Sequence, residues 1–142
     1  MSPLAAYGAL FLWSFLAATL LPLGSEPALV QLVRQYDRFL LPVLVATTGN
    51  YLGAVTTYLI GRGVARVAEP KTDSRAELRA KGVMTRWGQP ALLLSWVPFV
   101  GDAIVALAGA MRVPFAWFSL WVVLGKAARY AVVAWIALAA AR

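Results

Sequence analysis

Apolar residues of this chain gather in four long blocks, and two of these blocks are interrupted. The blocks Phe39–Ile60 and Phe115–Ala141 contain no break and are at least 22 residues long, enough to cross a hydrocarbon core of about 30 Å as helices. The blocks Leu4–Val33 and Pro90–Ala110 are each broken by proline, glycine and a carboxylate. The pattern predicts two full membrane spans and two broken apolar segments.

The two breaks are alike in composition and spacing. Each has a proline, Pro22 or Pro98, followed four residues later by an acid, Glu26 or Asp102, with a small residue directly before the acid. The apolar stretches after the two acids would rise only about 9 and 12 Å as helices, too little to cross a bilayer. We therefore predict re-entrant hairpins, which are tolerated at membrane depth where protein or water surrounds them.

The two halves of the chain fit one duplicated pattern with an offset of 76 residues. A hairpin returns to its own side of the membrane and a span changes side, so the second repeat must be inverted. Matched Gly/Pro-broken segments in two halves indicate a transporter substrate site. The predicted fold is an all-α integral membrane protein of two inverted repeats, each a Pro-broken re-entrant hairpin followed by a transmembrane helix. We treat 1–142 as a single membrane domain, with 1–60 and 90–142 as the repeats.

Residues 61–89 form the one hydrophilic segment, with seven basic residues against three acids. The positive-inside rule places this basic loop in the cytoplasm. Both termini then face outside if the broken segments are re-entrant, which we favour, and inside if those segments cross completely. Ser74 to Glu77 match a capping box, which predicts a short surface helix, although we favour a solvated loop.

Composition indicates a membrane protein and limits the reactions that its side chains can perform. Hydrophobic residues make up 61%, charged residues 13%, and the mean hydropathy is +0.73. The net charge of +7 resides mostly in the basic loop and predicts orientation in the membrane rather than nucleic-acid binding. Cysteine and histidine are absent, which excludes disulfides, thiol nucleophiles and histidine acid–base chemistry. We expect no enzymatic activity, no catalytic residues, no metal and no cofactor.

Ionisable residues within or beside the apolar blocks are the candidate site residues, because a charge in the membrane is costly and usually functional. The predicted substrate- or proton-binding residues are Glu26, Asp102, Lys126, Arg129, Asn50 and Arg112. Lys126 and Arg129 are three residues apart and share a helix face near the middle of the last block. Asn50 holds the position that corresponds to Lys126 in the first half.

These charges allow two interpretations. In the structural one, Glu26 and Asp102 cap helices, with Pro27 directly after Glu26, and the two cations pair with the two acids. In the functional one, Lys126 and Arg129, aided by helix N-termini, receive an anionic headgroup. The carboxylates then exchange protons, since burial disfavours their charged form.

Gly49 and Gly53 form a small-xxx-small pattern that permits close approach of another helix. We favour packing of this face against the chain's own hairpin, with homo-oligomerisation as the alternative.

Specific motifs are spread over the whole chain. They are Ala18-Thr19-Leu20-Leu21-Pro22, Ser25-Glu26, Gly49-Asn50-Tyr51-Leu52-Gly53, Gly61-Arg62, Leu94-Ser95-Trp96-Val97-Pro98-Phe99-Val100-Gly101-Asp102, Ala108-Gly109-Ala110-Met111-Arg112 and Gly125-Lys126-Ala127-Ala128-Arg129-Tyr130. With these motifs the chain resembles the YqaA-type branch of the DedA (VTT-domain, "SNARE-associated Golgi protein") superfamily.

The resemblance implies a fold of two inverted hairpin-plus-helix repeats. It also implies movement of phospholipids or polyprenyl phosphate carriers across membranes, often with proton dependence. The arginines that flank the second hairpin's Ile-Pro motif in the superfamily are replaced here by Ser95 and Gly101-Asp102. From the resemblance and from the charged residues within the apolar blocks, we expect a multi-pass lipid or lipid-phosphate translocator of the bacterial inner membrane. A non-transporting structural or assembly subunit with paired buried charges is the alternative.

Overall fold

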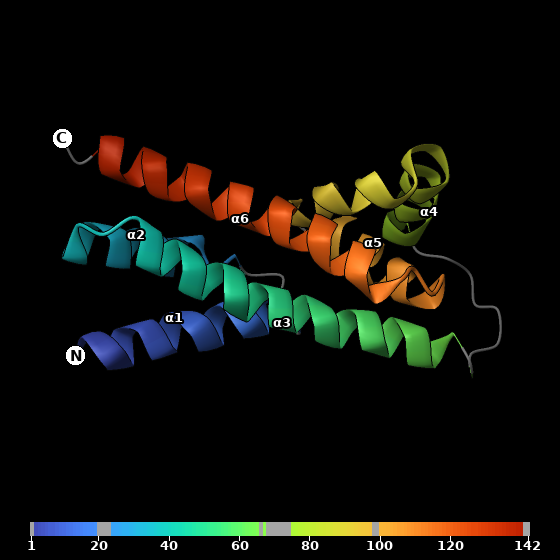
Figure 1. Cartoon of the computed structure of the whole chain (residues 1–142), viewed down its shortest axis with the longest axis horizontal. Helices are drawn as coiled ribbons and strands as arrows, with labels where there is room; N and C mark the ends of the chain where they lie inside the picture. The colour runs from blue at the N-terminus through green and yellow to red at the C-terminus, as the bar shows by residue number, and fades with distance from the viewer. Residues whose placement is uncertain (1, 20–23, 66, 68–74, 98–99, 141–142) are drawn as a thin grey trace. The chain divides into compact units, whose positions relative to one another are not determined.

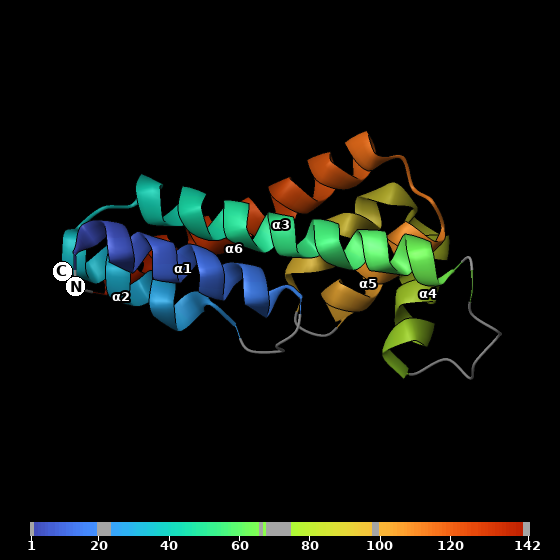
Figure 2. The same ribbon diagram turned by 90° about the horizontal axis from the view of Figure 1, so that it is seen from below.

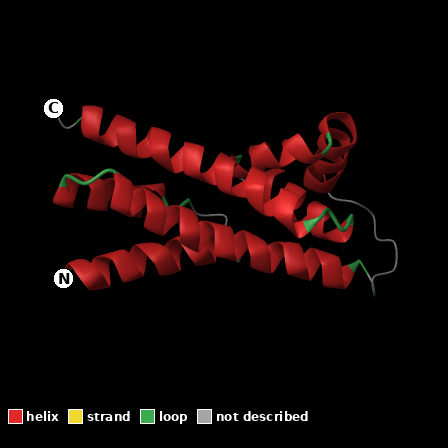
Figure 3. Ribbon diagram, in the orientation of Figure 1, coloured by secondary structure: helices red, strands yellow, loops and turns green. Residues whose placement is uncertain are grey.

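The computed structural model describes residues 2–19, 24–65, 67, 75–97 and 100–140, and within those ranges it contains helices and no strand (Figures 1 and 3). The helices are α1 (Pro3–Ala17), α2 (Glu26–Tyr36), α3 (Leu40–Val64), α4 (Arg75–Trp87), the 3-10 helix η1 (Gln89–Trp96), α5 (Val100–Ala110) and α6 (Phe115–Ala139). The all-α prediction is confirmed for this part of the chain.

Each broken block yields two short helices and each unbroken block yields one long helix. The first broken block forms α1 and α2, and the second forms η1 and α5. Helices α1, α2 and α5 have 15, 11 and 11 residues, so they rise only about 16–22 Å and are too short to cross a bilayer alone. The breaking prolines, Pro22 and Pro98, lie outside the described residues.

Helices α3 and α6 have the length and surface of membrane spans. Each has 25 residues and rises about 37 Å, more than a hydrocarbon core of about 30 Å. Both are apolar enough to cross a membrane and keep most of their apolar windows unburied, with 39% and 33% buried. Leu59 on α3 and Trp135 on α6 are 55% and 67% exposed. Exposed apolar faces on two long helices are what a bilayer accommodates.

The chain divides into two compact units. The first unit contains residues 1–53 and 126–142, and the second contains residues 54–125. In the first unit α2 runs back alongside α1 (Figures 1 and 2). Apolar side chains of α1, α2 and the parts of α3 and α6 in this unit form its core, which includes Leu10, Leu29, Val33 and Ala134.

Close backbone contact joins α1 to α3 within the first unit. An ideal Cβ at Gly49 would lie 2.5 Å from the carbonyl oxygen of Phe11, and one at Gly53 would lie 2.5 Å from that of Phe15. Real Cβ atoms essentially never come so close. The small-xxx-small face of α3 is therefore filled by α1 of the same chain.

In the second unit, α4 and η1 pack against α5. The ring of Tyr58 on α3 stacks on Phe118 at a centroid distance of 4.4 Å, and its hydroxyl donates to the carbonyl of Val113 at 2.6 Å. The expectation of a solvated loop before η1 is wrong, because residues 75–87 form α4. Ala80 and Met84 lie four residues apart on one face of α4 and are buried, and this apolar contact stabilises a helix too short to persist alone.

The contact between α1 and α3 predicts different effects for the same substitution at two glycines of α3. Gly53→Ala places a methyl group against the Phe15 carbonyl and should destabilise by about 1–3 kcal/mol through overpacking. Gly63→Ala is the control, because a Cβ at Gly63 meets nothing within 4 Å. Thermal unfolding in neutral detergent should show a lower midpoint for Gly53→Ala alone. Equal midpoints for the two variants would contradict this contact.

Candidate functional site

The first unit contains a cluster of polar side chains drawn from all four of its helical segments. We define the polar cluster as Ser14, Ser25, Glu26, Asn50, Lys126, Arg129 and Tyr130. It includes four of the six residues that the sequence predicts for the site. The structure brings together Glu26, Asn50, Lys126 and Arg129.

An ion pair between Glu26 and Arg129 joins α2 to α6. The two side chains are 24% and 21% exposed, so the pair lies at the edge of the cluster. Glu26 occupies the first turn of α2, where the positive end of the helix dipole also favours its carboxylate. The pair therefore combines charge neutralisation with partial access from outside the unit.

A second chain of contacts joins α6, α3 and α1. The ammonium of Lys126, which is 3% exposed, donates to Oδ1 of Asn50. Nδ2 of the same amide donates to the carbonyl of Ser14 at 3.1 Å. An amide has both a donor and an acceptor, so Asn50 can serve a cation and a carbonyl at once. This explains a buried asparagine near the middle of the long apolar helix α3.

Hydroxyl groups complete the polar cluster. The hydroxyls of Ser25 and Tyr130 lie 2.5 Å apart and are buried. The hydroxyl of Thr47, which is 8% exposed, has no hydrogen-bond partner within the described residues. Buried polar groups normally have partners, so this hydroxyl is available for a further hydrogen bond.

Sequence reasoning missed Ser14, Ser25 and Tyr130 because hydroxyl groups carry no charge to mark them. Two signals point to them in retrospect. Tyr130 follows Lys126 by four residues and so lies on the same face of α6. Ser14 continues the buried face of α1 that Ala6 and Leu10 form at the same four-residue spacing.

The capping expectation for the two acids is wrong. Ser25 occupies the position before α2, and its side chain bonds to Tyr130 instead of capping the helix. Asp102 lies in the first turn of α5, which begins at Val100. Both acids thus lie inside the first turn, where a carboxylate still interacts favourably with the helix dipole.

Asp102 and Arg112, the other two predicted site residues, belong to the second unit. Arg112 follows the end of α5, is exposed and adopts a positive φ of 55°. This conformation is uncommon for a residue other than glycine and turns the chain towards α6. The structure thus places Arg112 in the connection between two helices.

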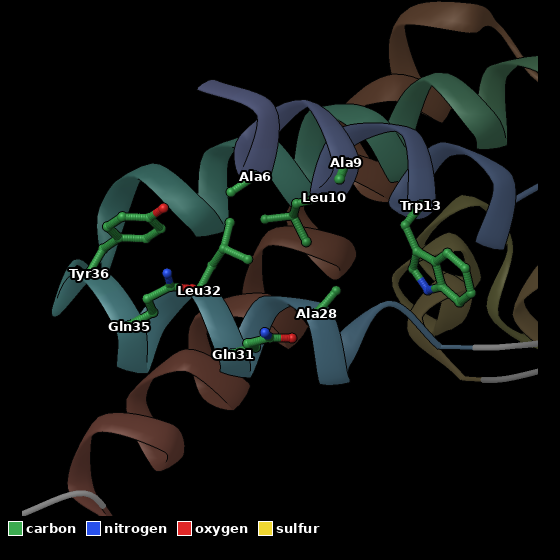
Figure 4. A pocket seen from close by; sticks show the side chains of 9 residues that line it. All are labelled: Ala6, Ala9, Leu10, Trp13, Ala28, Gln31, Leu32, Gln35 and Tyr36. Carbon is green, nitrogen blue, oxygen red and sulfur yellow. The ribbon is translucent and has the colours of Figure 1, made fainter. Parts of the chain in front are cut away.

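A groove lies between α1 and α2 in the first unit (Figure 4). Its volume is about 180 Å³, and its lining residues are Ala6, Ala9, Leu10, Trp13, Ala28, Gln31, Leu32, Gln35 and Tyr36. Trp13 stands at one end and Tyr36 at the other. The indole N–H of Trp13 donates to the carbonyl of Gly24 at 3.4 Å, two residues before Glu26. The groove is mostly apolar, with two amides along one wall, and its Trp13 end adjoins the polar cluster.

Comparison with known proteins identifies the family of this chain. Residues 4–137 match the VTT domain. The chain belongs to the VTT-domain family. It is 42% identical over 135 residues to the inner membrane protein YqaA of Escherichia coli K12, covering 94% of this chain and 92% of that protein. The same figures hold for YqaA of Shigella flexneri.

The VTT-domain relatives also include an uncharacterized protein of Haemophilus influenzae, 42% identical over 132 residues, which cover 85% of this chain and 80% of that protein. No solved structure matches the chain significantly. The resemblance to the YqaA-type branch of the DedA/VTT superfamily is confirmed, and the chain is a membrane protein of that family.

The Glu26–Arg129 ion pair predicts strong coupling between the two residues. Glu26→Gln and Arg129→Gln each leave one charge without its partner, whereas the double variant removes both charges. A double-mutant cycle on unfolding in neutral detergent should give a coupling energy of about 1–3 kcal/mol. Additive effects, with coupling below about 0.5 kcal/mol, would show that the pair contributes nothing to the fold.

Proposed function

We propose that this protein moves a phospholipid or a lipid phosphate across the bacterial inner membrane. The relatives named above are inner membrane proteins by name, which supports this location. The observation that carries the proposal is the Glu26–Arg129 ion pair at the edge of a buried polar cluster. The protein acts as a transporter and not as an enzyme in this proposal.

The polar cluster offers the groups that an anionic headgroup requires. A guanidinium binds phosphate through two parallel N–H donors and an ammonium binds it as a point charge. Arg129 and Lys126 share a face of α6 and supply both. A phosphate that takes the place of Glu26 on Arg129 keeps the guanidinium paired. The displaced carboxylate then binds a proton, which would couple lipid movement to proton movement.

The groove between α1 and α2 supports a lipid rather than a free anion as the substrate. Its apolar floor suits an acyl chain, and Gln31 and Gln35 offer amide groups to the ester region of a lipid. A volume of about 180 Å³ equals only about six water molecules in the liquid. The groove would therefore hold part of one lipid chain while the rest of the lipid stays in the bilayer.

The proposal includes two re-entrant hairpins and an inverted repeat. The short lengths of α1, α2 and α5 support hairpins that enter the membrane without crossing it. The contact between Lys126 and Asn50, which are 76 residues apart, supports the repeat. The repeat offset is also 76 residues, so Asn50 and Lys126 occupy equivalent positions of the two repeats. Equivalent positions of two repeats contact each other where the two-fold axis that relates the repeats passes between them.

The structural or assembly role is the second candidate. The observation that favours it is that Glu26 and Lys126 already have partners within the first unit. Under this role, substitutions in the polar cluster would reduce stability, and any loss of function would follow that reduction. Under the transport role, a variant that folds normally would still lose transport.

Lipid transfer in vesicles tests the proposal with two chemically matched variants. Phosphatidylglycerol with a fluorescent headgroup should reach the outer leaflet faster in vesicles containing the protein than in protein-free vesicles. Glu26→Gln should lower this rate by about tenfold or more, which corresponds to about 1.4 kcal/mol, without a matching loss of folded protein.

Asp37→Asn is the control for that assay because it makes the same kind of change away from the polar cluster. Asp37 adopts a left-handed conformation after α2, which asparagine also tolerates, so this variant should keep the wild-type rate. Background transfer by the wild type with every anionic lipid tested would contradict the proposal. Equal rates for the wild type and Glu26→Gln would contradict the role of the ion pair.

A further inference from the structure

Three arginines of α4 lie on one face of the helix. At 100° per residue, Arg75, Arg79 and Arg86 fall within about 40° of each other on the helical wheel. All three are exposed. The buried residues Ala80 and Met84 fall on the other side, about 140° away. We call Arg75, Arg79 and Arg86 the arginine stripe.

The surroundings of the arginine stripe are apolar and open. Leu78 and Trp87, on either side of the stripe, are 57% and 63% exposed. Gly82 lies between the arginines on the same side, and a Cβ there would meet nothing within 4 Å. Basic side chains flanked by exposed Leu and Trp are typical of helices that lie in a membrane interface.

The position of α4 in the second unit suits a helix at the bilayer surface. It packs on the apolar helices η1 and α5 through its buried face. It also runs across the direction of the C-terminal part of α3, as Figures 1 and 2 both show. Where α3 spans a membrane, a helix that lies across its direction lies along the membrane plane.

We propose that the arginine stripe docks on the headgroups of anionic phospholipids in the leaflet beside the C-terminal end of α3. Charge complementarity identifies the occupant, because three guanidinium groups on one face match a surface of phosphates. This docking holds α4 on the leaflet and does not depend on lipid translocation. The hydrophilic segment 61–89 thus contains a lipid-binding surface. Its positive charge by itself predicts only the orientation of the chain in the membrane.

A spin label at Gly82 tests the docking directly. The chain has no cysteine, so Gly82→Cys gives a single labelling site with open space around it. The protein is placed in nanodiscs of phosphatidylcholine, with or without phosphatidylglycerol. Phosphatidylglycerol should shield the label from a water-soluble nickel chelate. Salt at about 1 M should reverse the shielding, because the Debye length falls to about 3 Å.

Two double variants distinguish an effect of the arginine stripe from an effect of the net charge of the protein. Each arginine near an anionic surface is worth about fivefold in the docking equilibrium. In the labelled protein, Arg75→Gln with Arg79→Gln should therefore lower the ratio of shielded to unshielded label by about 25-fold. Arg34→Gln with Arg38→Gln removes the same charge from exposed positions of the first unit and should leave the ratio unchanged.

Three results would overturn the proposal. The first is shielding that is equal in both lipid mixtures. The second is an equal fall in shielding for the two double variants, which would mean that net charge alone is responsible. The third is shielding by soluble polyglutamate but not by phosphatidylglycerol, which would identify an acidic protein as the partner. Size-exclusion profiles that match the wild type confirm that the variants remain folded.

Discussion

Two cations near the middle of α6 impose the main constraint on the first unit. Lys126 and Arg129 lie on a helix that is long and apolar enough to cross a membrane, and in such a helix an unpaired charge is costly. Each is met by a different helix, Arg129 by Glu26 of α2 and Lys126 by Asn50 of α3. Asn50 in turn holds the carbonyl of Ser14 on α1. The contacts of these two cations therefore link α6 to α2, to α3 and, through Asn50, to α1.

The same constraint connects the fold to the proposed transport. The short helix α2 presents its N-terminal turn and the acid of that turn, Glu26, to α6. Helix α2 thus supplies Glu26 to Arg129 and one wall of the groove that Trp13 and Tyr36 delimit. An ion pair at the edge of a polar cluster can exchange one anionic partner for another. A fully enclosed pair would serve the fold alone.

Sequence alone predicted the two long apolar helices, the broken segments and four charged or amide residues of the polar cluster. These features follow from the cost of charges and breaks in apolar segments, which a single sequence reveals. It did not predict α4, because that helix depends on burial of Ala80 and Met84 against other helices. It also missed Ser25 and Tyr130. Hydroxyl groups are common in spanning helices, and only tertiary contact shows which of them meet.

In the proposed transport role, the polar cluster holds the headgroup of a lipid. Crosslinking with a phosphatidylglycerol analogue that has a photoreactive group beside the phosphate, followed by mass spectrometry of the labelled peptides, tests this role. We expect labelling around Glu26 and around Arg129 that unlabelled phosphatidylglycerol competes away. Labelling confined to exposed apolar side chains outside the cluster, such as Trp135, or to α4 would contradict this role.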